Sequence, residues 1–199
     1  MTKITTFSEY SKRAAETQME SCKNEDYLRL GLISEVGELA AIFKRAIRGD
    51  FKLEDKQEDI ILELGDICWY LERLYYLYYN RSVFINWNRD EGFIWESCRV
   101  RHRSVVHPEW KMPQLLASVT KIYNIPESLS VRNGQYPSRT KRKAFVNTFS
   151  DIAILSNAFG FTIWDVLTAN IEKLAKRKAQ GQIIGSGDHR EDDLPDGDE

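Results

Sequence analysis

The chain has 199 residues, 42% of them hydrophobic and 29% charged, with a net charge of −2; this fits one domain with one core and excludes a disordered or fibrous protein. No apolar run approaches the roughly 18 residues of a membrane-spanning helix, and the first ten residues contain no apolar signal region. Because the three cysteines show no CxxC spacing that would indicate a disulfide framework, we expect a cytoplasmic protein with no membrane partner.

Three helices are predicted in the first eighty residues. Thr6 begins a capping box and opens a helix over about 6–22. Asn24 can cap a second helix, which ends at Gly49. Its apolar stripe consists of Leu28, Leu32, Val36, Leu39, Phe43 and Ile47. A third helix is predicted from 53–58 to about Asn80, and it is apolar nearly all round, which is typical of a buried helix.

Three more helices are predicted in the second half of the chain. Pro113 suits the first turn of a helix that reaches about Tyr123. Another helix is expected over about 140–158, and Thr162 begins a second capping box that opens a last helix to about Gln180. Stretches of period 2 are scarce throughout, so the sequence predicts an all-α fold.

The charges are unevenly distributed along the chain. Residues 1–180 hold 27 basic and 23 acidic side chains, whereas residues 181–199 hold one basic and seven acidic side chains. Residues 99–145 alone hold ten basic and two acidic side chains. Such a basic segment attracts a polyanion, either a nucleic acid or a nucleoside triphosphate, or else it is a solvated loop, and composition does not choose between these.

We therefore predict one domain over residues 1–184. It carries a basic, partly helical insertion at about 81–141, and an acidic, flexible tail follows at 185–199.

Four carboxylates form two pairs at i, i+3 spacing. Glu63 and Asp66 share one face of the apolar third helix, where two acids need compensation for their burial. Glu35 and Glu38 form a second pair at the border of the preceding helix's apolar stripe. Pairs on two helices joined by a short connection can converge on one cation, and ligation by oxygen alone favours Mg²⁺, with Mn²⁺ as the alternative. Alternatively, each pair consists of surface carboxylates that form salt bridges with Lys or Arg.

Three blocks of the sequence resemble the MazG-like nucleotide pyrophosphohydrolases, a family of the all-α NTP pyrophosphatase superfamily. The blocks are GLISEVGELAAIFKRAIRGD, ELGDICWYL and NIEKLAKRKAQG, which begin at residues 31, 63 and 170. The family signature is a Glu pair followed after a spacer by Glu-x-x-Asp, and the two pairs above match it. Ser34 stands where many members have a further Glu.

The resemblance implies a MazG-like helical bundle that hydrolyses (deoxy)nucleoside triphosphates to the monophosphate and pyrophosphate. It implies Mg²⁺ held between Glu35, Glu38, Glu63 and Asp66, and a homodimer or homotetramer. Either Glu35 or Glu38 is then the catalytic carboxylate that orients or deprotonates the attacking water.

Further side chains are candidates for substrate binding. Tyr70 lies one turn after the second acid pair and can pack on the base or sugar, or is an ordinary core tyrosine. Arg45 lies on the same side of its helix as Glu38 and can bridge to an acid or reach a phosphate. Asn170, Lys173 and Arg177 share one face of the last helix and match the residue types of the family motif; the two basic ones can bind phosphate oxygens, or the face is simply solvated.

Two other functions remain open. The first is a nucleic-acid-binding helical protein whose working surface is the basic insertion, although we do not expect nucleic acid as a partner. Its basic residues include Arg132, Arg139, Lys141, Arg142 and Lys143. The second is a non-catalytic interaction module on the same bundle.

Overall fold

The computed structural model describes residues 3–80, 108–123 and 139–181, and all the regular structure within these ranges is helical. The predicted all-α fold is therefore confirmed. The predicted acidic tail and most of the predicted insertion lie outside the described residues.

The helices follow the chain in the order expected from the sequence. They are α1 (Phe7–Thr17), η1 (Glu20–Cys22), α2 (Glu25–Arg48), η2 (Leu53–Lys56), α3 (Gln57–Tyr79), α5 (Pro108–Tyr123), α6 (Arg139–Ala158) and α7 (Ile163–Ala179), where η marks a short 3₁₀ helix. The side chains of Thr6, Asn24 and Thr162 each accept a hydrogen bond from a backbone N–H of the first turn, as their predicted capping roles require. Gly49 ends α2 with a φ of +94°, a conformation that glycine adopts without strain.

The first helix is shorter than predicted: the sequence predicted a helix to about residue 22, whereas α1 ends at Thr17. In a longer helix the carbonyl oxygen of Ala14 would accept from the backbone N–H of Gln18. Here it accepts from Thr17 Oγ1 of the same helix at 2.9 Å and from the indole Nε1 of Trp69 on α3 at 3.2 Å, and Trp69 Nε1 also lies 3.0 Å from Thr17 Oγ1. Side chains of α1 and α3 thus take the place of the next helical bond, and the chain turns into η1.

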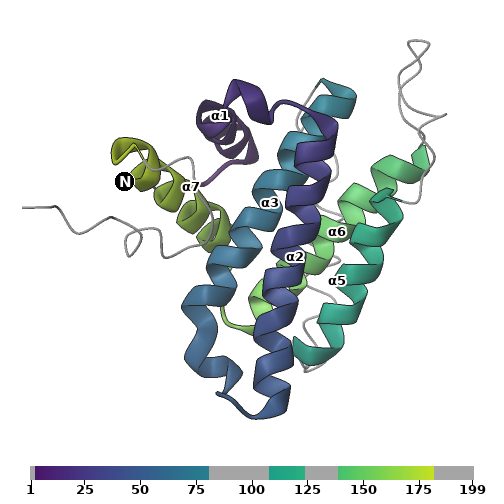
Figure 1. Cartoon of the computed structure of the whole chain (residues 1–199), viewed down its shortest axis with the longest axis vertical. Helices are drawn as coiled ribbons and strands as arrows, with labels where there is room; N and C mark the ends of the chain where they lie inside the picture. Colours follow the sequence, from purple (N-terminus) through teal and green to yellow (C-terminus); the bar gives the residue numbers. More distant parts are fainter. Residues whose placement is uncertain (1–2, 81–107, 124–138, 182–199) are drawn as a thin grey trace, which may run out of the picture.

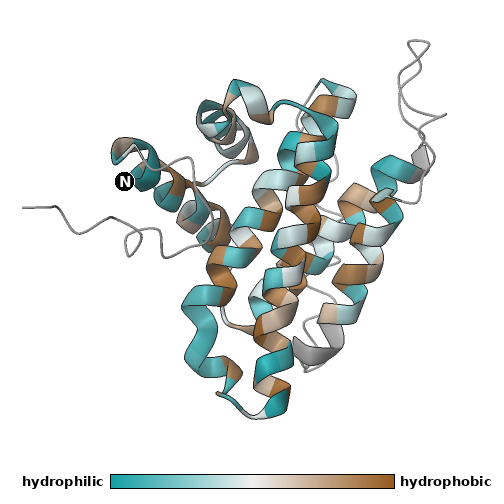
Figure 2. Ribbon diagram, viewed as in Figure 1, coloured by the Kyte–Doolittle hydropathy of each residue, from teal (hydrophilic) through white to brown (hydrophobic). Residues whose placement is uncertain are grey.

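Helices α2, α3, α5 and α6 run side by side along the long axis of the molecule, while α1 and α7 pack against α3 to one side (Figure 1). The turn through η2 makes α2 and α3 antiparallel neighbours. Hydrophobic and hydrophilic residues alternate along the helices (Figure 2), and each described α-helix contributes hydrophobic residues to one buried core. No single described helix is long and apolar enough to cross a membrane, and the one helix pair that passes together, Lys141–Ala158 with Ile163–Ala179, is bent by 97°.

The predicted apolar stripe of α2 is buried except at its end. Five of its members lie in the core: Leu28, Leu32, Val36, Leu39 and Phe43. The prediction is wrong for Ile47, which is 73% exposed in the last turn of the helix. Helix α3 is buried on nearly every side as expected, and its buried residues include Glu63, Glu72 and Arg73.

The described part of the predicted insertion belongs to the bundle. Helix α5 packs against α6 and α2, and it buries Met112, Leu115, Val119 and Ile122. The prediction that Pro113 lies in the first turn of this helix is wrong, because Pro113 lies inside the helix. The first position is taken by Pro108, which suits it because the missing N–H would have no helical partner there.

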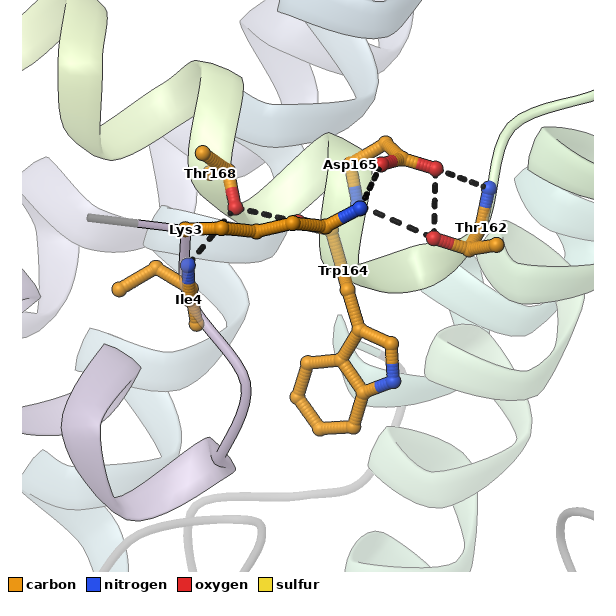
Figure 3. A network of polar contacts seen from close by, with 6 residues as sticks. All are labelled: Lys3, Ile4, Thr162, Trp164, Asp165 and Thr168. Carbon is orange, nitrogen blue, oxygen red and sulfur yellow. Dashed lines mark hydrogen bonds and ion pairs between the residues drawn. The ribbon is translucent and has the colours of Figure 1, made fainter. Parts of the chain in front are cut away.

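The chain's N-terminal segment fixes the start of α7 (Figure 3). Lys3 Nζ donates to Asp165 Oδ1 at 2.6 Å, and the Ile4 backbone N–H donates to Thr168 Oγ1 at 3.0 Å. Asp165 also accepts from the backbone N–H of Thr162 at 2.8 Å, which completes the capping box. These contacts hold the helix that carries the predicted basic face against the bundle.

Candidate metal centre

Three of the four predicted metal ligands meet between α2 and α3. Glu35, Glu63 and Asp66 each offer one carboxylate oxygen, and these oxygens lie within 4.8 Å of one another. We call these three residues the acid cluster. Glu63 is buried, and the other two are half-buried. Three converging carboxylates without histidine or cysteine fit a hard divalent ion such as Mg²⁺ or Mn²⁺.

The close approach of α7 to α3 brings further polar groups to the acid cluster. A Cβ on Gly65 would lie 2.7 Å from Asn170 Cβ and 3.3 Å from the backbone oxygen of Val166, so a larger residue would separate the two helices. Because Gly65 directly precedes Asp66, the contact delivers the α7 side chains to this carboxylate.

Asp66 is held by two side chains of α7. Asn170 Nδ2 donates to Asp66 Oδ1 at 2.8 Å, and Lys173 Nζ forms a salt bridge with Asp66 Oδ2. Asn170 is fully buried, and its Oδ1 accepts from Tyr10 Oη of α1 at 3.1 Å. Since an ionised Asp66 only accepts, the amide must turn its NH₂ toward it, which leaves the amide oxygen for Tyr10. Burial raises the pKa of Tyr10 well above 10.0, so this hydroxyl keeps its proton.

A cavity of about 110 Å³ opens beside the acid cluster. Glu35 and Asp66 belong to both, and the rest of the lining is largely aromatic or apolar with one arginine. The other lining residues are Thr17, Met19, Cys22, Tyr27, Trp69, Tyr70, Leu174 and Arg177.

Tyr70 forms one wall of the cavity and crosses α2 at Gly31. A Cβ on Gly31 would lie 2.1 Å from the Tyr70 ring, so the absence of a side chain there makes room for the ring. The rings of Tyr27 and Tyr70 are 6.1 Å apart and their hydroxyl oxygens are 3.4 Å apart. Burial, the Tyr27 hydroxyl and the charges of Glu35 and Asp66 all raise the pKa of Tyr70 far above its ordinary value. The wall therefore presents a neutral phenol that can donate a hydrogen bond.

The remaining predicted ligand lies outside the acid cluster. Glu38 is exposed on α2, one turn after Glu35, and Ser34 Oγ lies 3.4 Å from its Oε1. Glu38 is therefore not one of the three converging carboxylates.

The predicted substrate-binding residues divide into three groups. Tyr70 and Arg177 line the cavity. Asn170 and Lys173 contact Asp66 instead, and neither belongs to the cavity lining among the described residues. Arg45 lies near the far end of α2, ten residues or about 15 Å beyond Glu35. There it is exposed, 3.5 Å from Asp50 Oδ2 and 5.2 Å from the centre of the Phe51 ring.

Sequence reasoning did not single out Tyr10, Tyr27 or Trp69. Tyr10 and Asn170 are 160 residues apart, so no local spacing connects them. Trp69 and Tyr27 were indistinguishable from the many other aromatic residues, because their place in the cavity depends on how α1 and α2 cross α3. The glycines at 31 and 65 were the available signals, since a glycine inside a long helix often marks a close approach.

Comparison with known proteins found no family whose pattern matches the chain, and no significant match among curated proteins or solved structures.

Proposed function

We propose that the chain hydrolyses nucleoside triphosphates to the monophosphate and pyrophosphate in the presence of Mg²⁺. The observation that carries the proposal is the junction of the acid cluster with the cavity, through the shared residues Glu35 and Asp66. A metal-bound phosphate chain at the cluster would leave the nucleoside end within reach of the aromatic walls.

The acid cluster supplies the proposed metal ligands. Glu35, Glu63 and Asp66 would hold Mg²⁺, which when bound neutralises charge on the phosphate chain and polarises a water molecule. Glu38 stands outside the cluster and remains available to orient the attacking water or take its proton. In this arrangement Glu35 binds the metal, and Glu38 is the better candidate for the catalytic carboxylate.

The cavity walls supply the proposed nucleotide contacts. The Arg177 guanidinium can bind phosphate oxygens through paired hydrogen bonds. Tyr27, Trp69 and Tyr70 offer ring faces and edges to a base or sugar, and the Tyr70 hydroxyl can donate to an oxygen of the ligand.

The test is pyrophosphate release from a panel of NTPs and dNTPs, with Mg²⁺ and with a chelator. We expect release that requires the metal, and a loss of about a hundredfold or more in Glu63→Gln, because a buried ligand charge is removed. Glu58→Gln is the matched control, since Glu58 is exposed in the first turn of the same helix, and it should keep the wild-type rate. A well-folded wild type that releases no pyrophosphate from any substrate would leave the non-catalytic module as the function.

We do not propose a nucleic-acid function. Lys141, one of the basic residues of that alternative, is only 4% exposed and lies 3.7 Å from the centre of the Tyr78 ring. Arg132 lies outside the described residues. A mobility shift of DNA or RNA that survives Glu63→Gln would favour that alternative.

A further inference from the structure

The acid cluster has a cation of its own. Lys173 reaches Asp66 from α7, and the two side chains are only 10% and 13% exposed. Carboxylates whose oxygens lie within 4.8 Å of one another repel where little water screens them. A buried ammonium group at one edge offsets this repulsion, so the metal-free protein can hold the three acids together.

A divalent ion and the Lys173 ammonium group repel each other when both lie against Asp66. We propose that Lys173 is an internal counter-ion, which holds Asp66 in the metal-free protein and competes with the metal for it. The inference rests on the proposed function in one respect, namely that the acid cluster binds a divalent ion.

The geometry of α7 also indicates where the displaced lysine goes. Arg177 lies four residues after Lys173, so both side chains project from one face of the helix, and Arg177 lines the cavity. The flexible four-carbon stem of Lys173 lets its ammonium group turn from Asp66 toward that side. There it adds a second positive charge for the phosphate chain. When the metal binds, the ammonium group of Lys173 thus leaves Asp66 and contacts the phosphate chain of the substrate instead.

The experiment is a calorimetric titration of the metal-free full chain with Mn²⁺ in the absence of nucleotide. Lys173→Met removes the competing charge, so we expect Mn²⁺ to bind about tenfold more tightly than to the wild type. In chelator the same variant should unfold at a lower temperature, because the acids lose their counter-ion, and Mn²⁺ should stabilise it more than it stabilises the wild type. Lys176→Met is the control, since it removes an exposed charge from the same helix, and its Mn²⁺ affinity should match that of the wild type.

Equal or weaker Mn²⁺ binding by Lys173→Met would overturn the inference, and so would the absence of Mn²⁺ binding in both proteins. If Lys173→Met does not fold in chelator, Lys173→Gln, which keeps an uncharged donor for Asp66, is titrated with the same expectation. Pyrophosphate release is measured separately. Tighter Mn²⁺ binding by the variant without turnover by the wild type would reject the proposed function alone, whereas turnover with unchanged Mn²⁺ affinity would reject the inference alone.

Discussion

At the scale of single residues, two glycines of α2 have opposite surroundings. Gly31 faces the Tyr70 ring, whereas an added Cβ on Gly37 would meet no atom within 4 Å. We expect Gly37→Ala to raise the free energy of unfolding by about 0.5–1 kcal/mol, because alanine loses less backbone entropy in a helix. Gly31→Ala should gain less or lose stability, since the Tyr70 ring must move. Urea denaturation of the two variants measures the difference.

The same pair of variants tests the cavity wall. Displacing Tyr70 changes the shape of the cavity, so Gly31→Ala should weaken nucleotide binding while Gly37→Ala leaves it unchanged. Equal stabilisation of the two variants, with unchanged nucleotide affinity in both, would mean that the Tyr70 ring does not pack over Gly31.

The hydrogen bond from Tyr10 to Asn170 couples α1 to the acid cluster. Tyr10→Phe keeps the ring but removes the donor, which leaves the buried Asn170 oxygen without this bond, so we expect a loss of about 1–3 kcal/mol of stability. If the effect runs through this bond, Tyr10→Phe should cost much less in an Asn170→Ala background. Urea denaturation of the wild type, both single variants and the double variant measures the coupling. Strictly additive losses would show that Tyr10 acts independently of Asn170.

At the scale of elements, the start of α7 depends on a charged Asp165. Partial burial raises the pKa of this carboxyl, but hydrogen bonds from Lys3 and Thr162 outweigh it and hold the pKa below its ordinary value of 3.8. A carboxyl whose pKa falls on folding stabilises the protein at pH values above the pKa of its unfolded state. This stabilisation is lost as the pH falls through the pKa of the folded state.

Asp165→Asn should therefore be less stable than the wild type at pH 7, by about 1 kcal/mol, as is usual for a helix cap. The gap should close as the pH is lowered below 3.8, because the wild-type carboxyl then takes up a proton and loses its charge. The urea midpoints of the two proteins across this range measure the gap. A gap that stays constant as the pH is lowered below 3.8, until the wild type itself unfolds, would mean that the charge of Asp165 is not what stabilises α7.

At the scale of the whole molecule, the sequence predicted the helices well because their signals are local. Capping residues such as Asn24 and Thr162 and the apolar stripe of α2 act within one or two turns, and the structure reproduces them. Errors arose where a distant helix intervenes, as at Ala14, whose carbonyl is taken by Trp69. Ile47 shows a second limit, since the apolar period of the sequence continues through the last turn of α2 although this side chain is exposed.

The acid cluster was predicted in part for the same reason. Helical spacing places Glu63 and Asp66 on one face, and the i, i+3 rule holds within α3. Which acid of α2 meets them depends on how the two helices cross, and this crossing brings Glu35 into the cluster and leaves Glu38 outside it, exposed on α2. The contacts of Asn170 and Lys173 with Asp66 depend on the close approach of α7 to α3 at Gly65. The spacing of residues within one helix cannot predict such an approach.

Metal binding should be visible in the stability of the entire fold, because a bound ion would connect residues of α2 and α3, the two helices that contribute the acid cluster. An ion that binds only the folded state, at a concentration a hundredfold above its dissociation constant, adds about 2.7 kcal/mol. For a chain of this size we expect the melting temperature to rise by roughly 5–10 °C relative to the protein in chelator. Thermal unfolding followed by circular dichroism, with Mg²⁺, Mn²⁺ or chelator, measures this shift. In Glu63→Gln the shift should nearly vanish, whereas Glu58→Gln should keep it; an equal shift in all three proteins would place the bound ion elsewhere.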